Sequence, residues 1–141
     1  MFKIFLKRSF YTSFFKFHEY TLIGDNMEEL FKIAEQEMIE LHHPYVGTEH
    51  FILAYLKKFG NDYITYDKFK EYIIKIIGCS FKESEYILYT PILRKIKNEC
   101  DNYIEACVRI LTDDDSIAYN VLLSNNEDIE AIYLNILNTS N

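Results

Sequence analysis

Apolar residues recur at helical spacing through most of the chain after residue 26. The first such stripe consists of Leu30, Ile33, Ala34, Met38 and Leu41. Intervals of three and four residues place these side chains on one face of a helix. Asn26, with Glu29 three residues later, matches a capping box, so the pattern predicts a helix that begins at Asn26.

The next segment, FILAYL at residues 51–56, is apolar on all sides. A helix of this kind belongs in the interior of a domain. Thr48 can cap its N-terminus, and the helix dipole favours the carboxylate of Glu49 in the first turn. A third amphipathic helix follows and is predicted to end at Gly78, because glycine suits the left-handed conformation that terminates helices.

The second half of the chain continues with the same periodicity. Thr90 can be an N-cap, and Pro91 occupies the first helical position that proline prefers. The apolar stripe after it extends this predicted helix to about residue 109. Two shorter helices are expected in LTDDDSIAYNVLL, where the acids would start the helix, and in EDIEAIYLNIL. Nothing after residue 26 alternates like a strand, which predicts an all-α fold.

Comparison of the chain with itself suggests an internal repeat. A shift of 64 residues aligns Thr48 and Glu49 with Thr112 and Asp113. Two pseudo-symmetric helical repeats in one domain are therefore expected, which also fits a length of 141 residues. The predicted domain spans 27–138, with repeat one at 27–78, a loop at 79–89 and repeat two at 90–138.

Composition and charge narrow the function classes. The apolar content of 49% is ordinary for a soluble domain, and the formal net charge of -7 argues against nucleic acid as a partner. No stretch approaches the roughly 18 consecutive apolar residues of a membrane span. Cys79, Cys100 and Cys107 include no CxxC pair, so they predict neither a disulfide framework nor a zinc site. We therefore expect a cytoplasmic protein without a cofactor.

The N-terminal residues 1–26 differ from the rest of the chain. They are aromatic and basic, with no acid before Glu19. One interpretation is an added segment that packs its aromatic side chains on the domain. The alternative is an organellar transit peptide, because such peptides are amphipathic and poor in acids.

Two motifs carry a resemblance to a known family. The segment ELFKIAEQEMIELHHPYVGTEHFILAYLKK, residues 29–58, resembles the first repeat of the Clp N-terminal domain, which precedes the ATPase rings of ClpA- and ClpC-type unfoldases. YTPILRKI resembles the start of the second repeat in that family. The chain has no GxxxxGK[ST] phosphate loop, so it corresponds to this domain without the ATPase modules.

The resemblance implies a two-repeat helical domain that binds proteins and is not an enzyme. In this family the domain docks adaptor proteins and substrates of Clp ATP-dependent proteases, and it can hold phosphorylated arginine. Matching motifs place the first ligand site at Gly47, Thr48 and Glu49. The degenerate second site would comprise Thr90, Thr112 and Asp113.

Elementary chemistry allows this assignment and also a simpler one. A carboxylate can accept a planar guanidinium through two parallel hydrogen bonds, and amides at a helix start can hold an anion. Alternatively, Thr48 and Glu49 only cap a buried helix, which is worth about 1 kcal/mol.

The sequence also contains features of other classes of function. His42, His43 and His50 form a cluster that suggests a metal-binding protein, although they lack the HExxH spacing of zinc hydrolases. No serine or cysteine has a sequence context that ties it to a catalytic base. A stand-alone helical interaction protein unrelated to proteolysis is the main alternative to a Clp-linked module.

Overall fold

Helices make up nearly all regular structure in the computed structural model, which describes residues 19–79 and 86–139. In chain order they are α2 (Glu19–Leu41), α3 (Thr48–Lys58), α4 (Tyr66–Ile76), α5 (Pro91–Glu99), α6 (Tyr103–Leu111), α7 (Ile117–Ser124) and α8 (Ile129–Thr139). Within the described ranges, the one β-type feature is a parallel bridge between Val46 and Tyr89. The predicted all-α fold is confirmed.

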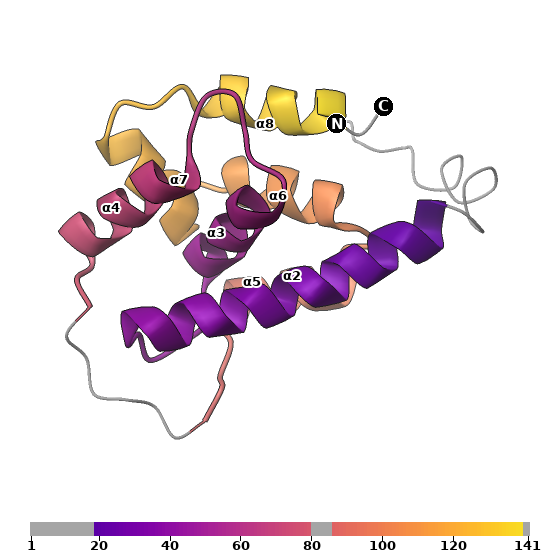
Figure 1. The fold of residues 1–141 in the computed structure, drawn as a ribbon, viewed down its shortest axis with the longest axis horizontal. Helices are drawn as coiled ribbons and strands as arrows, with labels where there is room; N and C mark the ends of the chain where they lie inside the picture. Colours follow the sequence, from indigo (N-terminus) through magenta and orange to yellow (C-terminus); the bar gives the residue numbers. More distant parts are fainter. Residues whose placement is uncertain (1–18, 80–85, 140–141) are drawn as a thin grey trace.

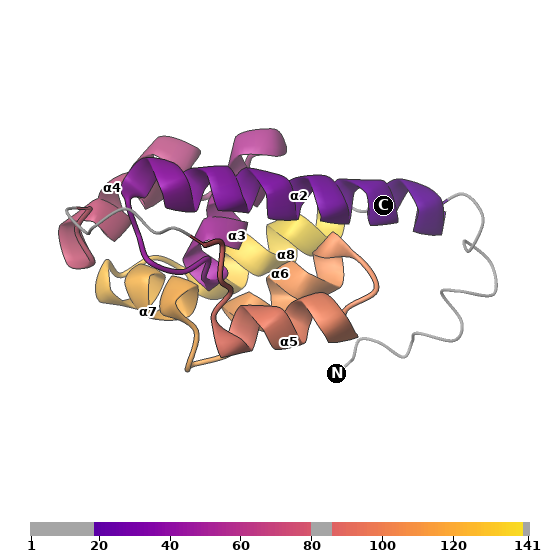
Figure 2. The same ribbon diagram turned by 90° about the horizontal axis from the view of Figure 1, so that it is seen from below.

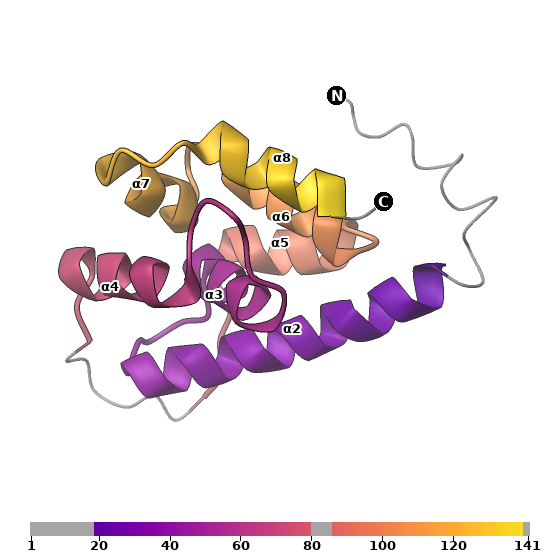
Figure 3. The ribbon, with the colours of Figure 1, turned by 45° about the horizontal axis from the view of Figure 1, so that its top comes forward.

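The centre of the fold is α3. Every residue from Thr48 to Leu56 is buried, as its apolar circumference predicts. The long helix α2 packs along α3, while α4, α6 and α7 contact α3 from other sides (Figures 1 and 2). The layer beyond α3 is formed by α5, α6 and α8, with α6 in contact with both neighbours (Figure 3).

The predicted start of the first helix is wrong. Helix α2 begins at Glu19, so Asn26 lies inside the helix and cannot be its N-cap. Glu29 pairs instead with Lys58 on α3 at 3.0 Å. The boundary proposed between residues 26 and 27 therefore falls within a continuous helix, while residues 1–18 of the expected extension lie outside the described residues.

The helix expected from Pro91 to about residue 109 is in fact two helices. Helix α5 ends at Glu99, and Asn102 caps α6 by accepting a hydrogen bond from the Glu105 N–H at 2.9 Å. The Glu105 carboxylate in turn accepts from the Asp101 N–H at 3.1 Å. These bonds stabilise a break that the continuous apolar stripe conceals.

The start of α7 also differs from the prediction. Ser116 is the N-cap, and its hydroxyl donates to the Ile110 carbonyl at 2.8 Å and accepts from the Tyr119 N–H at 3.1 Å. The acidic run 113–115 lies in the preceding turn. The Ser116 hydroxyl makes two hydrogen bonds within the protein, so it is a better N-cap than an aspartate of the run 113–115.

The 64-residue register of the repeat pairs unlike positions. Thr48 is the first residue of α3, whereas its partner Thr112 is the C-cap of α6. The alignment therefore pairs the start of one helix with the end of another, so the structure does not support this register. The pseudo-symmetric repeat itself stays a prediction.

Several local predictions are confirmed. Thr90 caps α5 by accepting a hydrogen bond from the Leu93 N–H, with Pro91 in the first turn. Gly78 follows α4 with φ of +91°, in the left-handed region. Along α8, Ile129, Ile132 and Ile136 are buried. Each helix of the described ranges is too short or too polar to cross a lipid bilayer.

Candidate functional site

The start of α3 is the candidate site. Gly47 is the N-cap residue of this helix, so the prediction that Thr48 caps it is wrong: Thr48 is the first helical residue, and its hydroxyl is used elsewhere. The Gly47 backbone is extended, with φ of -115° and ψ of -178°. The Thr48 hydroxyl accepts a hydrogen bond from the Ala118 N–H of α7 at 3.2 Å. Both Thr48 and Gly47 are buried, so the hydroxyl joins two helices of the core and is not presented to a ligand.

A chain of hydrogen bonds through two histidines holds this helix start. The Gly47 N–H donates to Nδ1 of His50 at 2.8 Å. His50 Nε2 lies 2.9 Å from Nδ1 of His43, and His43 Nε2 lies 2.6 Å from the Gly78 carbonyl. Because His50 Nδ1 accepts, its Nε2 carries the proton and donates to His43, which then donates to Gly78. Both rings are neutral in this arrangement, and it ties the ends of α2 and α4 to α3.

Burial keeps His50 neutral. Desolvation, assisted by the neighbouring His43 ring, lowers the pKa of His50 to about 3. Nδ1 of His50 lies 3.9 Å from Glu49 Oε2. Since the ring carries no charge at neutral pH, this approach is not an ion pair.

Glu49 is a buried carboxylate with an unsatisfied oxygen. Its exposed fraction is only 4%, and Oε1 has no hydrogen-bond partner. Burial raises the pKa of Glu49 to about 7, although a bond to its own backbone N–H opposes the shift. Most buried polar atoms in proteins are paired, so an orphan oxygen marks a strained site or a place for a ligand.

Glycine at position 47 leaves room for this carboxylate. A Cβ atom built on Gly47 would meet Oε1 of Glu49 well inside normal contact distance. The φ angle at Gly47 is accessible to any residue, so space and not backbone strain requires glycine here. Gly47 and Glu49 are therefore coupled sterically.

A cavity of about 410 Å³ lies beside Glu49. Its wall is largely apolar. It includes Pro44, Tyr45, Ile76, Ile77, Ile117 and Val121, and the polar lining consists of Glu49, His43, Thr90, Asn120 and Ser124. No lysine or arginine lines it. The cavity thus combines an apolar wall with one carboxylate, which suits a cation carried on an apolar stem.

The structure separates the residues of the predicted second site. Thr90 lines the Glu49 cavity, although its hydroxyl caps α5. Thr112 and Asp113 do not line this cavity. The Thr112 hydroxyl donates to the Val108 carbonyl at 2.7 Å, and Asp113 accepts from the Asp115 N–H at 2.9 Å. Both side chains therefore make hydrogen bonds within local turns and are not presented to a ligand at the Glu49 cavity.

Of the three clustered histidines, only two are brought together. His42 is exposed with φ of +57°, while His43 and His50 lie with Glu49 in a group whose potential ligand atoms are within 4.8 Å of one another. The hydrogen-bond chain already occupies Nδ1 and Nε2 of both rings. A metal ion would have to break that chain, so the geometry favours a supporting role for the histidines.

Several residues of this site were missed by sequence reasoning. The cavity wall contributed by Ile117, Asn120 and Val121 comes from α7, about 70 residues after Glu49 in the chain. No local pattern links the two segments. His43 was singled out only as part of a histidine cluster, and its acceptor, the Gly78 carbonyl, has no sequence signal.

Comparison with known proteins does not assign the chain to a protein family. A scan against models of protein families matches none of them. A search of curated proteins likewise finds no significant relative. The likeness to the Clp N-terminal domain therefore rests on the residues named above.

Proposed function

We propose that this protein is a non-catalytic binding module that receives an arginine side chain of a partner protein beside Glu49. The observation that carries the proposal is the orphan Oε1 of Glu49, a buried acceptor on a residue that lines a cavity with no lysine or arginine in its lining. A guanidinium presents two parallel N–H donors and stays charged at all physiological pH values, so it satisfies a carboxylate better than an ammonium does.

The cavity supports an arginine ligand in a second way. The three methylene groups of arginine need apolar surface, which Ile77, Ile117 and Val121 supply. The Asn120 side chain, already bonded to the carbonyls of Asp114 and Ser116, holds one edge of the wall in place. The apolar wall and the fixed Asn120 side chain both suit binding of an arginine side chain, and binding alone needs no enzymatic reaction.

The phosphoryl half of a phosphoarginine has weaker support. The Gly47 N–H is engaged by His50, and the Glu49 N–H bonds its own carboxylate. No cation lines the cavity to balance a phosphoryl charge. We therefore infer that unmodified arginine is accepted at least as well as phosphoarginine.

The resemblance to the Clp N-terminal domain suggests the biological setting. A domain of this type without ATPase modules would act as an accessory or chaperone-like component of ATP-dependent proteolysis, binding adaptor or substrate proteins or a Clp-type ATPase supplied by another chain. A helical interaction protein outside proteolysis would use the same cavity with a different partner.

An amide NMR titration of the full chain tests the arginine site. The probes are N-acetyl-arginine methylamide, its citrulline analogue, which has the same shape without the charge, and phosphoarginine. We expect selective shifts from Gly47 to His50 with the arginine probe, and their loss in Glu49→Gln. Glu130→Gln on the exposed face of α8 is the matched control, because it removes the same charge far from the cavity lining.

The pH dependence of this binding provides an independent readout. Because the pKa of free Glu49 is about 7, a guanidinium must displace a proton at lower pH. Affinity for the arginine probe should therefore rise about tenfold between pH 6 and pH 8. Equal binding of arginine and citrulline, or binding that is independent of pH, would contradict the proposal.

A further inference from the structure

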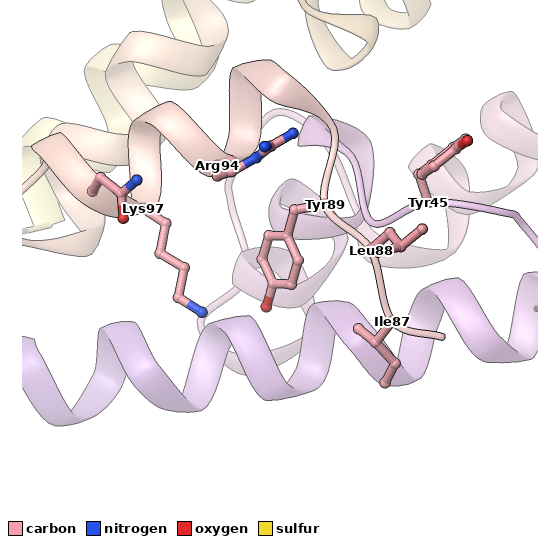
Figure 4. A pocket seen from close by; sticks show the side chains of 7 residues that line it. Tyr45, Ile87, Leu88, Tyr89, Arg94 and Lys97 are labelled. Atoms are coloured by element: carbon pink, nitrogen blue, oxygen red, sulfur yellow. The ribbon is translucent and has the colours of Figure 1, made fainter. Parts of the chain in front are cut away.

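A second surface, formed mainly by residues distant in sequence from Glu49, has the features of a peptide-binding groove. It lies between α5 and the extended segment 86–90, with a volume of about 530 Å³ (Figure 4). We call it the Tyr89 groove. It is lined by Tyr45, Ile87, Leu88, Tyr89, Arg94, Lys97 and Asn98.

The apolar part of the Tyr89 groove is unusually exposed. Tyr45, Ile87 and Leu88 keep 50%, 46% and 49% of their surface accessible. Single exposed apolar residues are ordinary, but a contiguous group of this kind marks interaction surfaces. The cluster is therefore available for a partner.

The charge of the groove is opposite to that of the protein. The chain carries a formal net charge of -7, yet the lining includes Arg94 and Lys97 and no carboxylate. The Arg94 guanidinium makes no hydrogen bond or ion pair within the described ranges. Lys97 lies over the Tyr89 ring, 4.7 Å from its centroid, and the Tyr89 hydroxyl donates to Glu35 on α2. Arg94 is thus the cation left for an external anion.

The backbone of the groove also has unused hydrogen-bonding groups. The Val46 N–H donates to the Leu88 carbonyl, and the Thr90 N–H donates to the Val46 carbonyl. Alternate residues of an extended segment point their polar groups to opposite sides, so those of Tyr89 face away from Val46. Neither the N–H nor the carbonyl of Tyr89 has a backbone partner in the described part of the chain. An extended segment could pair with this free edge.

We propose that the Tyr89 groove binds an extended segment of a partner protein in which acidic side chains flank an apolar or aromatic one. The apolar side chain packs on Leu88 and Tyr45, and a carboxylate pairs with Arg94. The chain's own residues 1–18 do not match this chemistry, because they carry cations and no acid. Tyr45 also lines the cavity beside Glu49, so the Tyr89 groove adjoins that cavity, whereas Ile87, Leu88 and Arg94 line the groove alone.

Fluorescence anisotropy with a labelled peptide tests the proposal. In the probe, two acidic pairs flank leucine and phenylalanine, and it contains no arginine, so the outcome does not depend on Glu49. One control peptide replaces the acids with their amides, and another replaces leucine and phenylalanine with serine. We expect saturable binding of the probe by the full chain and clearly weaker binding of both controls.

Two charge reversals on α5 form a matched pair. Arg94→Glu should weaken binding of the probe at least about tenfold, whereas Lys95→Glu, exposed on the same helix but outside the lining, should weaken it less than about twofold. In the wild type, amide shifts on titration should centre on Leu88 and Tyr89. These shifts test the proposal even if a variant folds poorly.

Three results would overturn the proposal. The first is equal loss of binding in the two variants, which would indicate general electrostatic attraction. The second is equal or tighter binding of a short single-stranded oligonucleotide, which would assign the groove to polyanions. The third is absence of probe-induced shifts at Leu88 and Tyr89 in the folded wild type.

Discussion

Glu37 and Glu49 are two buried glutamates with opposite surroundings. Glu37 is fully buried, yet both of its oxygens accept the Tyr66 hydroxyl at 2.7 and 2.9 Å, and Lys57 and Lys70 lie at 3.2 and 3.4 Å. The hydrogen bond with Glu37 raises the pKa of Lys57. Glu49 is almost as buried but leaves Oε1 without a partner.

The contrast separates a structural carboxylate from a candidate receptor. The partners of Glu37 come from α3 and α4, so this residue fastens three helices together. A buried carboxylate with an unsatisfied oxygen lowers stability, so the presence of Glu49 needs another reason. At Glu49 that reason is the proposed guanidinium ligand.

The largest expected effect is a gain of stability in Glu49→Gln at high pH. The folded-state pKa of about 7 exceeds the usual 4.5, so the folded protein holds a proton that the unfolded chain has lost between these values. The wild type therefore loses stability as pH rises from 4.5 to 7. We expect the variant to be more stable by about 3 kcal/mol at pH 8 and nearly unchanged at pH 4, measured by urea unfolding.

His50 affects stability with the opposite sign over an overlapping pH range. Its folded-state pKa of about 3 lies below the usual 6.5, so stability is lost as pH falls from 6.5 toward 3. In Glu49→Gln the protein should lose stability as the pH falls from 6.5 toward 3, without the gain of stability that protonation of Glu49 gives the wild type. Equal stability of the variant and the wild type at pH 8 would mean that Glu49 is not strained.

Glu37→Gln should change stability in the opposite direction. Glutamine keeps the shape of the side chain, but it loses the charge that Lys57 and Lys70 approach, and its NH₂ group replaces an oxygen that accepts a hydrogen bond from the Tyr66 hydroxyl. We expect a loss of about 2 kcal/mol at pH 7 in urea unfolding. A stabilised Glu37→Gln would abolish the distinction between the two sites.

The smallest effect expected is the steric coupling of Gly47 to Glu49. Gly47→Ala should lower the free energy of unfolding by about 1 kcal/mol, because the new methyl group meets the Glu49 carboxylate. In a Glu49→Ser background the same substitution should be neutral or slightly stabilising, since alanine restricts the unfolded chain. A double-mutant cycle in urea measures the difference, and additive effects would refute the coupling.

Much of the helical architecture was predictable from the sequence. The stripe on α2, the apolar circumference of α3 and the cap at Thr90 are local features, and each has its expected place. The resemblance to the Clp N-terminal domain pointed to Gly47, Thr48 and Glu49, and a ligand site at these residues stays a prediction. The sequence did not predict that the Thr48 hydroxyl is used by Ala118, because that contact joins segments 70 residues apart.

Two copies of one motif show where sequence reasoning fails. Asn26 with Glu29 and Asn102 with Glu105 both match a capping box, yet only Asn102 starts a helix. Asn26 lies inside α2, whereas the second motif interrupts an apolar stripe that continues on both sides of it. The four-residue capping motif does not by itself specify that a helix begins at its first residue. A cap is worth only about 1 kcal/mol, and the packing of the surrounding segment outweighs it.

The sequence by itself determined the all-α class and the apolar faces of most helices, since these depend on the spacing of apolar residues, but it did not fix every helix boundary. Only the tertiary structure decided the pairing of His43 with His50, the partners of Glu37 and the isolation of Glu49. Those properties depend on which distant groups fill the space around each side chain. Burial turns the presence or absence of one partner into a large free-energy difference, and this distinguishes two otherwise identical carboxylates.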